Sequence, residues 1–410
     1  MIKIESFFEL LQVSLGRRDA LSSILSDEEW KKMLVCAQKQ ALVGVCFTGV
    51  EALPKEQRPG RELLMQWYAL TTQIEARNGE INTRSVEACR YFEKHGFMAC
   101  VLKGQGNARM YAVSEKRKEK SEKLAVRRQS GDIDVWVKPH PRPLSKGRGE
   151  YIPIDAPYSI KESRLEVLRW VRQRFPNEDF DLKHIHFPII RDVAMEVHFV
   201  PSLLRSPIAN RRLQRFYEQE AERQMQHQVT LEGVDAKLGG LNCPTPEFNL
   251  VFQLTHIFDH FISEGVGLRQ VMDYYFVLRT QREQSEKGKE KSEKYGYDES
   301  PVRIIKSLGL YGFAGALMWV LHEVLGMEEE LMLCPMDERR GRVLLDEILA
   351  GGNFGQYESR YWYSGMSRWK FYVARMRRMM HFLRYYPSEV LWDIPFRIKQ
   401  RVWMIAHKKK

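Results

Sequence analysis

The chain has 410 residues, of which 44% are hydrophobic, 29% charged and 11% aromatic. This composition is typical of globular proteins and excludes a disordered chain, and the length favours two or three domains. The formal net charge of +11 lies in residues 360–410, where thirteen Lys and Arg face two acids, Glu389 and Asp393. The preceding 359 residues are balanced, with 51 charges of each sign.

No apolar run reaches the ~18 residues that a membrane-spanning helix needs. The first residues, MIKIESFFELL, place Glu5 and Glu9 where a signal peptide would have its apolar segment. The six cysteines form no C-x-x-C pair and lie mostly in apolar stretches. We therefore expect reduced thiols and a cytoplasmic protein.

Residues 1–95 are expected to form an N-terminal helical region. Apolar side chains recur at helical spacing after Phe7, and Ser26 before three acids is an N-cap signal. A further helical pattern runs to Lys94, with Gly96 as a suitable C-terminal cap. This region shows no cluster of catalytic side chains.

Residues 96–205 have the pattern of a small α/β core. Apolar stretches predict strands over residues 97–102, 133–137, 182–190 and 193–200. A glycine turn at 103–106 follows the first strand, and Arg191-Asp192 between the last two is a hairpin signal. Insertions are expected near 113–127 and 139–150, where Lys/Glu-rich and Pro/Gly-rich segments cannot bury apolar area.

Residues 206–410 are expected to be helical again. Thr245-Pro246 predicts a helix start, and this helix should run past His256 and His260 to the break at Gly265. A second Lys/Glu tract at 286–294 reads as another solvated insertion. The expected class is α+β, with a small mixed sheet between N-terminal and C-terminal helical regions and a basic aromatic tail.

The sequence Gly131-Asp132-Ile133-Asp134 is the most informative motif. Alternate side chains of a strand share one face, so Asp132 and Asp134 point to the same side. Two such carboxylates repel unless a cation bridges them, and oxygen ligands suit Mg²⁺. Glu196, an isolated acid in an apolar strand, is the candidate third carboxylate of a two-metal site. A solvated strand end would also explain a D-x-D pair, but the preceding glycine turn favours a site.

This combination resembles the nucleotidyltransferase superfamily with its DNA polymerase beta-like fold. It is most similar to a bacterial family of uncharacterised nucleotidyltransferases, which has an L-K-G turn, an R-x-x-G-D-I-D strand, an E-V-H strand, a helix with two histidines and a G-L-R-x-x-x-D segment. The matching positions in this chain are residues 102–104, 128–134, 196–198, 256 with 260, and 267–273.

The resemblance implies transfer of a nucleoside monophosphate from an NTP, with ATP as the expected donor, to a hydroxyl acceptor. Asp132, Asp134 and Glu196 would be the catalytic and metal-binding residues, with two Mg²⁺ ions or Mn²⁺ as cofactor. Glu196 would hold the second metal or deprotonate the acceptor. The acceptor, whether protein, small molecule or RNA, cannot be read from these residues.

The same resemblance implies a set of nucleotide-binding residues: Lys103, Gly104, Arg128, Ser130 and Gly131. Lys103 and Arg128 would neutralise phosphate charge, Gly104 would let the backbone approach phosphate, and Ser130 could donate a hydrogen bond. The turn lacks the serine that the wider superfamily usually has, and Lys103 could replace it as a point charge.

Five further residues are candidates for lining the cleft: His198, His256, His260, Arg269 and Asp273. His256 and His260 share a helix face, and core or interdomain hydrogen bonding, cleft lining and a zinc site are all open, with zinc the least favoured. Arg269 and Asp273 have the spacing of a helix-surface ion pair. His198 follows Glu196 on the same strand face and favours a supporting or substrate-binding role.

The basic tail allows two interpretations. It could be an amphipathic helix whose aromatic face packs on the body while arginine stems cover apolar surface. It could also bind an anionic partner, either nucleic acid or a membrane surface. For the whole chain, a catalytically silent nucleotide-binding or scaffold protein is the alternative to an enzyme.

Overall fold

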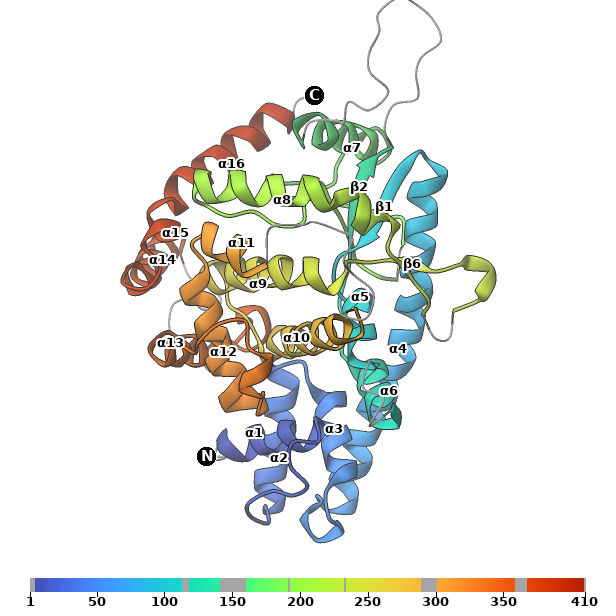
Figure 1. Ribbon diagram of the computed structural model, residues 1–410, viewed down its shortest axis with the longest axis vertical. Helices are drawn as coiled ribbons and strands as arrows, with labels where there is room; N and C mark the ends of the chain where they lie inside the picture. The colour runs from blue at the N-terminus through green and yellow to red at the C-terminus, as the bar shows by residue number, and fades with distance from the viewer. Residues whose placement is uncertain are drawn as a thin grey trace, which may run out of the picture.

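The computed structural model describes residues 4–112, 118–140, 160–190, 192–231, 234–288, 301–357 and 367–408. A small sheet lies beside a long helix, and further helices cover it and extend to both ends of the chain (Figure 1). The expected α+β class is therefore confirmed. Parts of the segments expected as insertions, residues 113–117, 141–150 and 289–294, fall outside the described residues.

The main sheet has four strands in the order β1-β2-β4-β3. Their bounds are Phe97–Val101 for β1, Ile133–Pro139 for β2, His184–His186 for β3 and Met195–His198 for β4. β2 and β4 are parallel, while β1 with β2 and β3 with β4 are antiparallel, so the sheet is mixed as predicted. Two short strands, Gln228–Val229 and Leu241–Asn242, form a second sheet.

The N-terminal helices are α1 (Ile4–Ser14), α2 (Asp27–Lys39), α3 (Val43–Ala52) and α4 (Arg61–Lys94). Ser26 caps α2 in a capping box with Glu29, because each side chain bonds to the backbone N–H of the other residue. α4 leads directly into β1, and Gly96 between them has a φ of +82°, as a helix-ending glycine requires.

Three helices accompany the main sheet: α5 (Gln105–Ala108), α6 (Lys118–Arg127) and α7 (Ile160–Arg174). α6 covers most of the segment expected as the first insertion. Its final turn is packed rather than solvated, since Leu124 and Arg127 are buried. Arg127 bonds to Glu75 of α4 and to Glu51 of α3, which attaches α6 to the N-terminal helices.

The C-terminal helices are α8 (Pro207–Gln226), α9 (Pro246–Ser263), α10 (Leu268–Gly288), α11 (Pro301–Ser307), α12 (Tyr311–Leu325), α13 (Glu338–Gly351), α14 (Arg368–Leu383), α15 (Pro387–Leu391) and α16 (Asp393–Lys408). Thr245 caps α9 as predicted. Within the described residues, no helix combines the length and apolar character that crossing a membrane requires.

One hydrophobic core joins the N-terminal helices to α9, α10 and α12. Trp136 of β2 reaches this core and stacks on Phe248 of α9, at 6.0 Å between ring centroids. The other face of the sheet packs on α4 and α7 through a second core. The sheet therefore holds its strand ends next to α9 and α10, which form the opposite wall of the site described below.

Candidate active site

Strand register places the predicted carboxylates together. β2 and β4 pair in parallel with Asp134 directly beside Glu196, so both side chains lie on the same face of the sheet. Their carboxylates and the His198 imidazole each offer a ligand atom, and these atoms lie within 4.8 Å of one another. The geometry is that of a group that could hold a metal ion.

Asp134 is the centre of this group and is 2% exposed. Its Oδ1 accepts a hydrogen bond from His198 Nε2 at 2.8 Å and lies 3.0 Å from Lys103 Nζ. The backbone N–H of Leu102 donates to the carbonyl oxygen of Asp134, which fixes the turn after β1 against β2. Lys103 and His198 thus occupy the coordination space of a buried carboxylate.

The charges in this group perturb one another. Burial alone would raise the pKa of Asp134, but Lys103 and His198 hold it well below its usual range. The negative charge of Asp134, together with burial, raises the pKa of the neighbouring Asp132 carboxyl. Burial opposes the imidazolium of His198, yet its bonds to Asp134 and Glu196 raise its pKa. An uncompensated repulsion between Asp132 and Asp134 remains, which a divalent cation would relieve.

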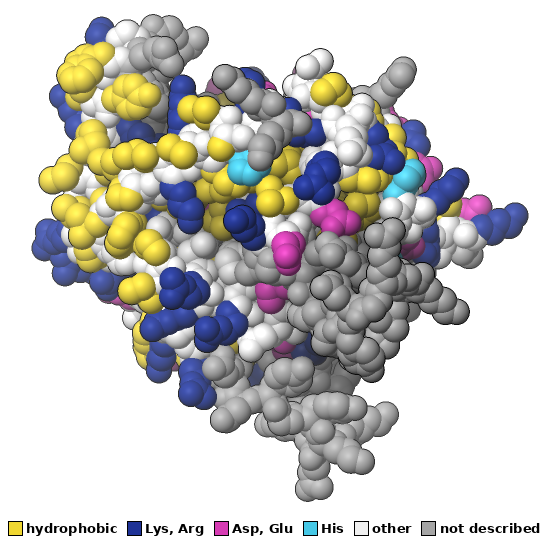
Figure 2. All heavy atoms as spheres, turned by 90° about the horizontal axis from the view of Figure 1, so that it is seen from above, with side chains coloured by type: hydrophobic (Ala, Val, Ile, Leu, Met, Phe, Trp, Pro, Cys, Tyr) yellow, Lys and Arg dark blue, Asp and Glu magenta, His cyan; other side chains and the backbone are white. Residues whose placement is uncertain are grey.

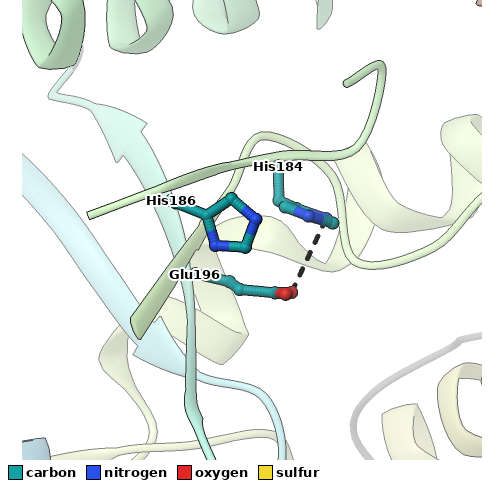
Figure 3. Close-up of side chains that lie close together, drawn as sticks. All are labelled: His184, His186 and Glu196. Carbon is teal, nitrogen blue, oxygen red and sulfur yellow. Dashed lines mark ion pairs between the residues drawn. The ribbon is translucent and has the colours of Figure 1, made fainter. Parts of the chain in front are cut away.

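A second group of potential ligands shares Glu196. Figure 3 shows His184 and His186 of β3 beside Glu196, and their ligand atoms also lie within 4.8 Å of one another. His184 Nδ1 lies 3.6 Å from Glu196 Oε2. This nitrogen atom is buried and has no hydrogen-bond partner among the described residues. Burial lowers the pKa of His184 to about 4, so this imidazole is neutral at pH 7.

A cavity opens in front of the Asp134 group, between the sheet and the helices α9 and α10. Its lining includes nine of the predicted residues: Lys103, Gly104, Arg128, Gly131, Asp132, Asp134, His256, Arg269 and Asp273. Residues that lie up to 170 positions apart in the sequence therefore meet at one site. Glu196 and His198 are not among the lining residues; His198 bonds to Asp134, and Glu196 lies beside Asp134 on the neighbouring strand and 3.3 Å from His198.

Arg128 and Asp273 form a buried bidentate ion pair at the wall of this cavity. Both distances, from Arg128 Nε and Nη2 to the two Asp273 oxygens, are 2.6 Å. Asp273 also accepts bonds from Tyr111 and Asn107. Arg269 and Asp273 therefore form no surface ion pair: both are buried and line the cavity, and Arg128, distant in the sequence, pairs with the carboxylate.

Arg269 is instead a buried cation beside the cavity. Its Nη1 donates to the carbonyl oxygen of Gln129 at 2.9 Å, while its Nε is buried without a hydrogen bond among the described residues. Its guanidinium lies 5.4 Å from the ring centre of Phe354. Burial, followed by the nearby charge of Arg128, lowers the pKa of Arg269 to about 10, so it is still charged at pH 7.

The sequence model of the uncharacterised nucleotidyltransferase family matches residues 26–299. The chain belongs to this family. The match includes both strands that carry the carboxylates and the two helices that close the cavity, and it supports nucleotidyl transfer as the general activity. No curated protein and no solved structure matches the sequence significantly.

Three further predicted residues, His256, His260 and Ser130, differ in how they relate to the cavity. His256 is buried and lines the cavity, and burial lowers its pKa well below the usual value. His260 packs edge-on against His256 at 4.3 Å but bonds to Glu264, away from the cavity. Ser130 donates its hydroxyl hydrogen to Gln105 of the turn.

The structure adds lining residues outside the predicted site set: Asn107, Gln253, Ile257, Gln270 and Phe354. Gln253 could have been found, because it precedes His256 by three positions and shares its helix face. Phe354 belongs to the Gly-rich stretch after α13, which contains no charged or metal-binding side chain that would mark it as part of a site. Its place depends on how that stretch crosses the turn between α9 and α10.

Proposed function

We propose that the chain transfers a nucleoside monophosphate from an NTP, with ATP as the expected donor, to a hydroxyl acceptor, with pyrophosphate as the second product. One observation carries the proposal: Asp134 stands beside Glu196 on adjacent parallel strands, and Asp132 lines the same cavity as Asp134, Lys103 and Arg269. Family membership supports the general reaction.

The donor set suits a divalent cation. Asp134, Glu196 and His198 already stand close enough to hold it, and Asp132, which lines the same cavity as Asp134, would join them after a small movement. Carboxylates favour Mg²⁺ or Mn²⁺, while an imidazole shifts the preference toward transition metals, so Mn²⁺ should serve at least as well as Mg²⁺. When bound, the cation would neutralise the triphosphate and polarise the attacked phosphorus–oxygen bonds.

Lys103 and Arg269 are the cations available to the phosphates. Lys103 now pairs with Asp134, and it can turn to phosphate once a cation neutralises that carboxylate. The unpaired Nε of Arg269 adds a buried donor. The guanidinium of Arg128 is already paired with Asp273. We therefore assign Arg128 to positioning the loop that carries Ser130 and Gly131, and not to direct phosphate binding.

Gly104 gives the backbone access to the phosphates. It has φ +61° and ψ −109°, a conformation that is open to glycine and strained for other residues. Its carbonyl oxygen accepts the N–H groups of Asn107 and Ala108, which holds the turn in place. The free space of the cavity is about 30 Å³, the share of one water in the liquid, so a nucleotide must displace side chains at its mouth.

Glu196 is the proposed base for the acceptor hydroxyl. It is more exposed than Asp134, with a side-chain exposure of 20% against 2%. The hydrogen bond from His198, at 3.3 Å from its Oε2, keeps its pKa below the ordinary value despite burial, so the carboxylate is ionised at pH 7. An ionised carboxylate at the rim can accept the proton of an incoming hydroxyl.

The test is incubation of the protein with each NTP, radiolabelled at the α-phosphate, in the presence of Mn²⁺ or Mg²⁺ and cell extract. We expect label transfer by the wild type and by Asp346→Asn, which changes an exposed acid on α13. Asp134→Asn should lose transfer by at least about 100-fold, as expected when a group that stabilises transition-state charge is removed. Equal labelling by wild type and Asp134→Asn would contradict the proposal.

A further inference from the structure

The C-terminal helix α16 turns a row of aliphatic side chains outward. Four residues that recur at helical spacing are 55–61% exposed: Ile394, Ile398, Val402 and Ile405. The opposite face of α16 packs on the body through Phe396 and Trp403. A helix of a globular protein normally buries its apolar stripe and exposes its polar side. In α16, an apolar stripe faces the solvent instead.

A second exposed row runs along α14. It consists of four residues that are 48–75% exposed: Trp369, Tyr372, Met376 and Met380. Leu391 and Trp392, which lie between the two helices in the sequence, are 67% and 42% exposed. We call these residues together the C-terminal apolar surface. Figure 2 shows hydrophobic side chains gathered with Lys and Arg on the side of the molecule where α14 to α16 lie.

Every exposed charge on these helices is positive. The exposed basic residues are Lys370, Arg377, Arg384, Arg397, Lys399, Arg401 and Lys408. The two acids of residues 367–408, Glu389 and Asp393, are both buried. Helical spacing puts Lys399 on one side of the α16 row and Arg397 and Arg401 on the other. The apolar surface is therefore bordered by cations with no exposed acid among them.

Buried polar contacts fix this orientation. Asp393 accepts bonds from Arg205 at 2.9 Å and from Arg375 at 3.0 Å. Glu389 accepts the backbone N–H groups of Arg205 and Ser206. Turning the apolar row inward would break these ion pairs and leave buried charges uncompensated, which is strongly unfavourable. The outward position of the row is thus part of the fold.

We infer that the C-terminal apolar surface binds the surface of an anionic lipid bilayer, with α16 lying in the plane of the interface. Aliphatic and aromatic side chains would enter the boundary between headgroups and acyl chains, and the flanking Lys and Arg would contact acidic headgroups. Long basic side chains beside an apolar row suit this arrangement, because their stems lie along apolar surface while the charges reach the headgroups.

Charge and side-chain chemistry favour lipid over other occupants. A second copy of the chain would bring two cationic borders together without an acid to pair them. A single-stranded nucleic acid would match the charge and could stack on Trp369, Tyr372 and Trp392, but it would leave the aliphatic row of α16 exposed to water. An anionic bilayer can pair its acidic headgroups with the cationic border and also cover the aliphatic side chains.

The test is co-sedimentation of the full-length protein with phosphatidylcholine vesicles that contain or lack phosphatidylserine. The informative variant is Ile398→Asp/Val402→Asp, which should fold because both positions are exposed. The matched control is Ile24→Asp/Val35→Asp, which places the same charges at exposed positions in the N-terminal region. Circular dichroism and thermal unfolding establish that both variants are folded.

We expect wild type and control to sediment with the phosphatidylserine vesicles and far less with pure phosphatidylcholine. The α16 variant should bind at least about tenfold more weakly. No binding by wild type, or equal binding by the α16 variant, would overturn the inference. A wild-type dimer that becomes monomeric in the variant would assign the surface to a second copy, and binding of a single-stranded oligonucleotide with no vesicle binding would assign it to nucleic acid. Both of these outcomes also overturn it.

Discussion

Outside the group of Asp134, Glu196 and His198, Asp273 is the single residue whose contacts do most to hold the site in place. Its carboxylate holds the Arg128 guanidinium through two bonds and also accepts bonds from Tyr111 and Asn107. Through Arg128 it fixes the segment that leads into Asp132. This residue therefore acts on the site by positioning it, although it lies on α10, far away in the sequence.

Replacing Asp273 by Asn should destabilise the protein by about 3–5 kcal/mol, because it leaves a buried arginine without its counter-charge. The free energy of unfolding in urea measures this loss. Asp346→Asn, the same change at an exposed position on α13, should alter stability by less than about 0.5 kcal/mol. A loss at Asp273 no larger than that of the control would contradict the assigned role.

The same pair predicts how stability depends on pH. Burial would raise the pKa of Asp273, but Arg128 and Tyr111 hold it below the ordinary value. A carboxyl with a lowered folded-state pKa stabilises the fold above its unfolded pKa of about 3.9, and this contribution is lost as the pH falls through the folded value. The stability difference between wild type and Asp273→Asn should therefore be full at pH 6 and shrink below about pH 4. A difference that stays constant down to pH 3 would exclude the ionised pair as its source.

Among the elements, the glycine-rich segment after α13 packs unusually closely. Gly355 has a φ of +65°, and a Cβ there would collide with the carbonyl oxygen of Glu264 at the end of α9. The preceding Phe354 lines the cavity beside Arg269. The close approach of two turns thus delivers an aromatic ring to the site.

Gly355→Ala should lower stability by about 1–3 kcal/mol, since the added methyl group forces backbone apart. It should also weaken NTP binding, because Phe354 and Arg269 would move. Gly79→Ala is the matched control: no atom lies within 4 Å of its added Cβ, and alanine is favoured within a helix such as α4. Urea unfolding and calorimetric titration with NTP measure the two effects. A Gly355→Ala protein as stable as wild type would show that the segment can move apart freely.

Helix starts and strands could be predicted because each depends on a short pattern of neighbouring residues. The N-cap at Ser26, the Thr245-Pro246 helix start and the hairpin partners β3 and β4 all follow from short patterns that the structure confirms. The D-x-D strand and the Glu196 strand were found in the same way. That Asp134 and Glu196 lie side by side depends on the register of two strands, which no local pattern gives.

The parts that escaped prediction depend on long-range packing. Spacing suggested that Asp273 pairs with Arg269 on its own helix, whereas a buried arginine 145 positions away takes it. The cavity role of Phe354 depends on two turns meeting. The outward aliphatic row of α16 could not be foreseen either, because periodicity shows that a stripe exists but not which face the body covers.

At the scale of the whole molecule, the sheet cannot be separated from the helices. Trp136 of β2 stacks on Phe248, and Cys100 and Leu102 of the first strand and turn are buried in the core that N-terminal and C-terminal helices share. Residues 96–205 alone would expose this surface to water. We expect that fragment to show no cooperative thermal transition by circular dichroism, while the full chain does. A fragment with a sharp transition would show that the α/β core folds by itself.

The excess of basic residues and the candidate active site lie in different parts of the molecule. The basic excess lies on α14 to α16 and the residues next to them, while the cavity is lined by cations such as Lys103 and Arg269 together with the acids Asp132, Asp134 and Asp273. Binding of a lipid surface and nucleotidyl transfer are therefore independent claims, and each can fail without the other.

The central claim, transfer of a nucleoside monophosphate, is tested most directly by following which phosphate reaches the product. Parallel reactions would contain one NTP labelled at the α-phosphate or at the γ-phosphate, with Mn²⁺ and the acceptor-containing extract. The account predicts that α-label enters the product, that γ-label leaves as pyrophosphate, and that Asp134→Asn abolishes both. Transfer of γ-label to the product would identify phosphoryl transfer and contradict the account.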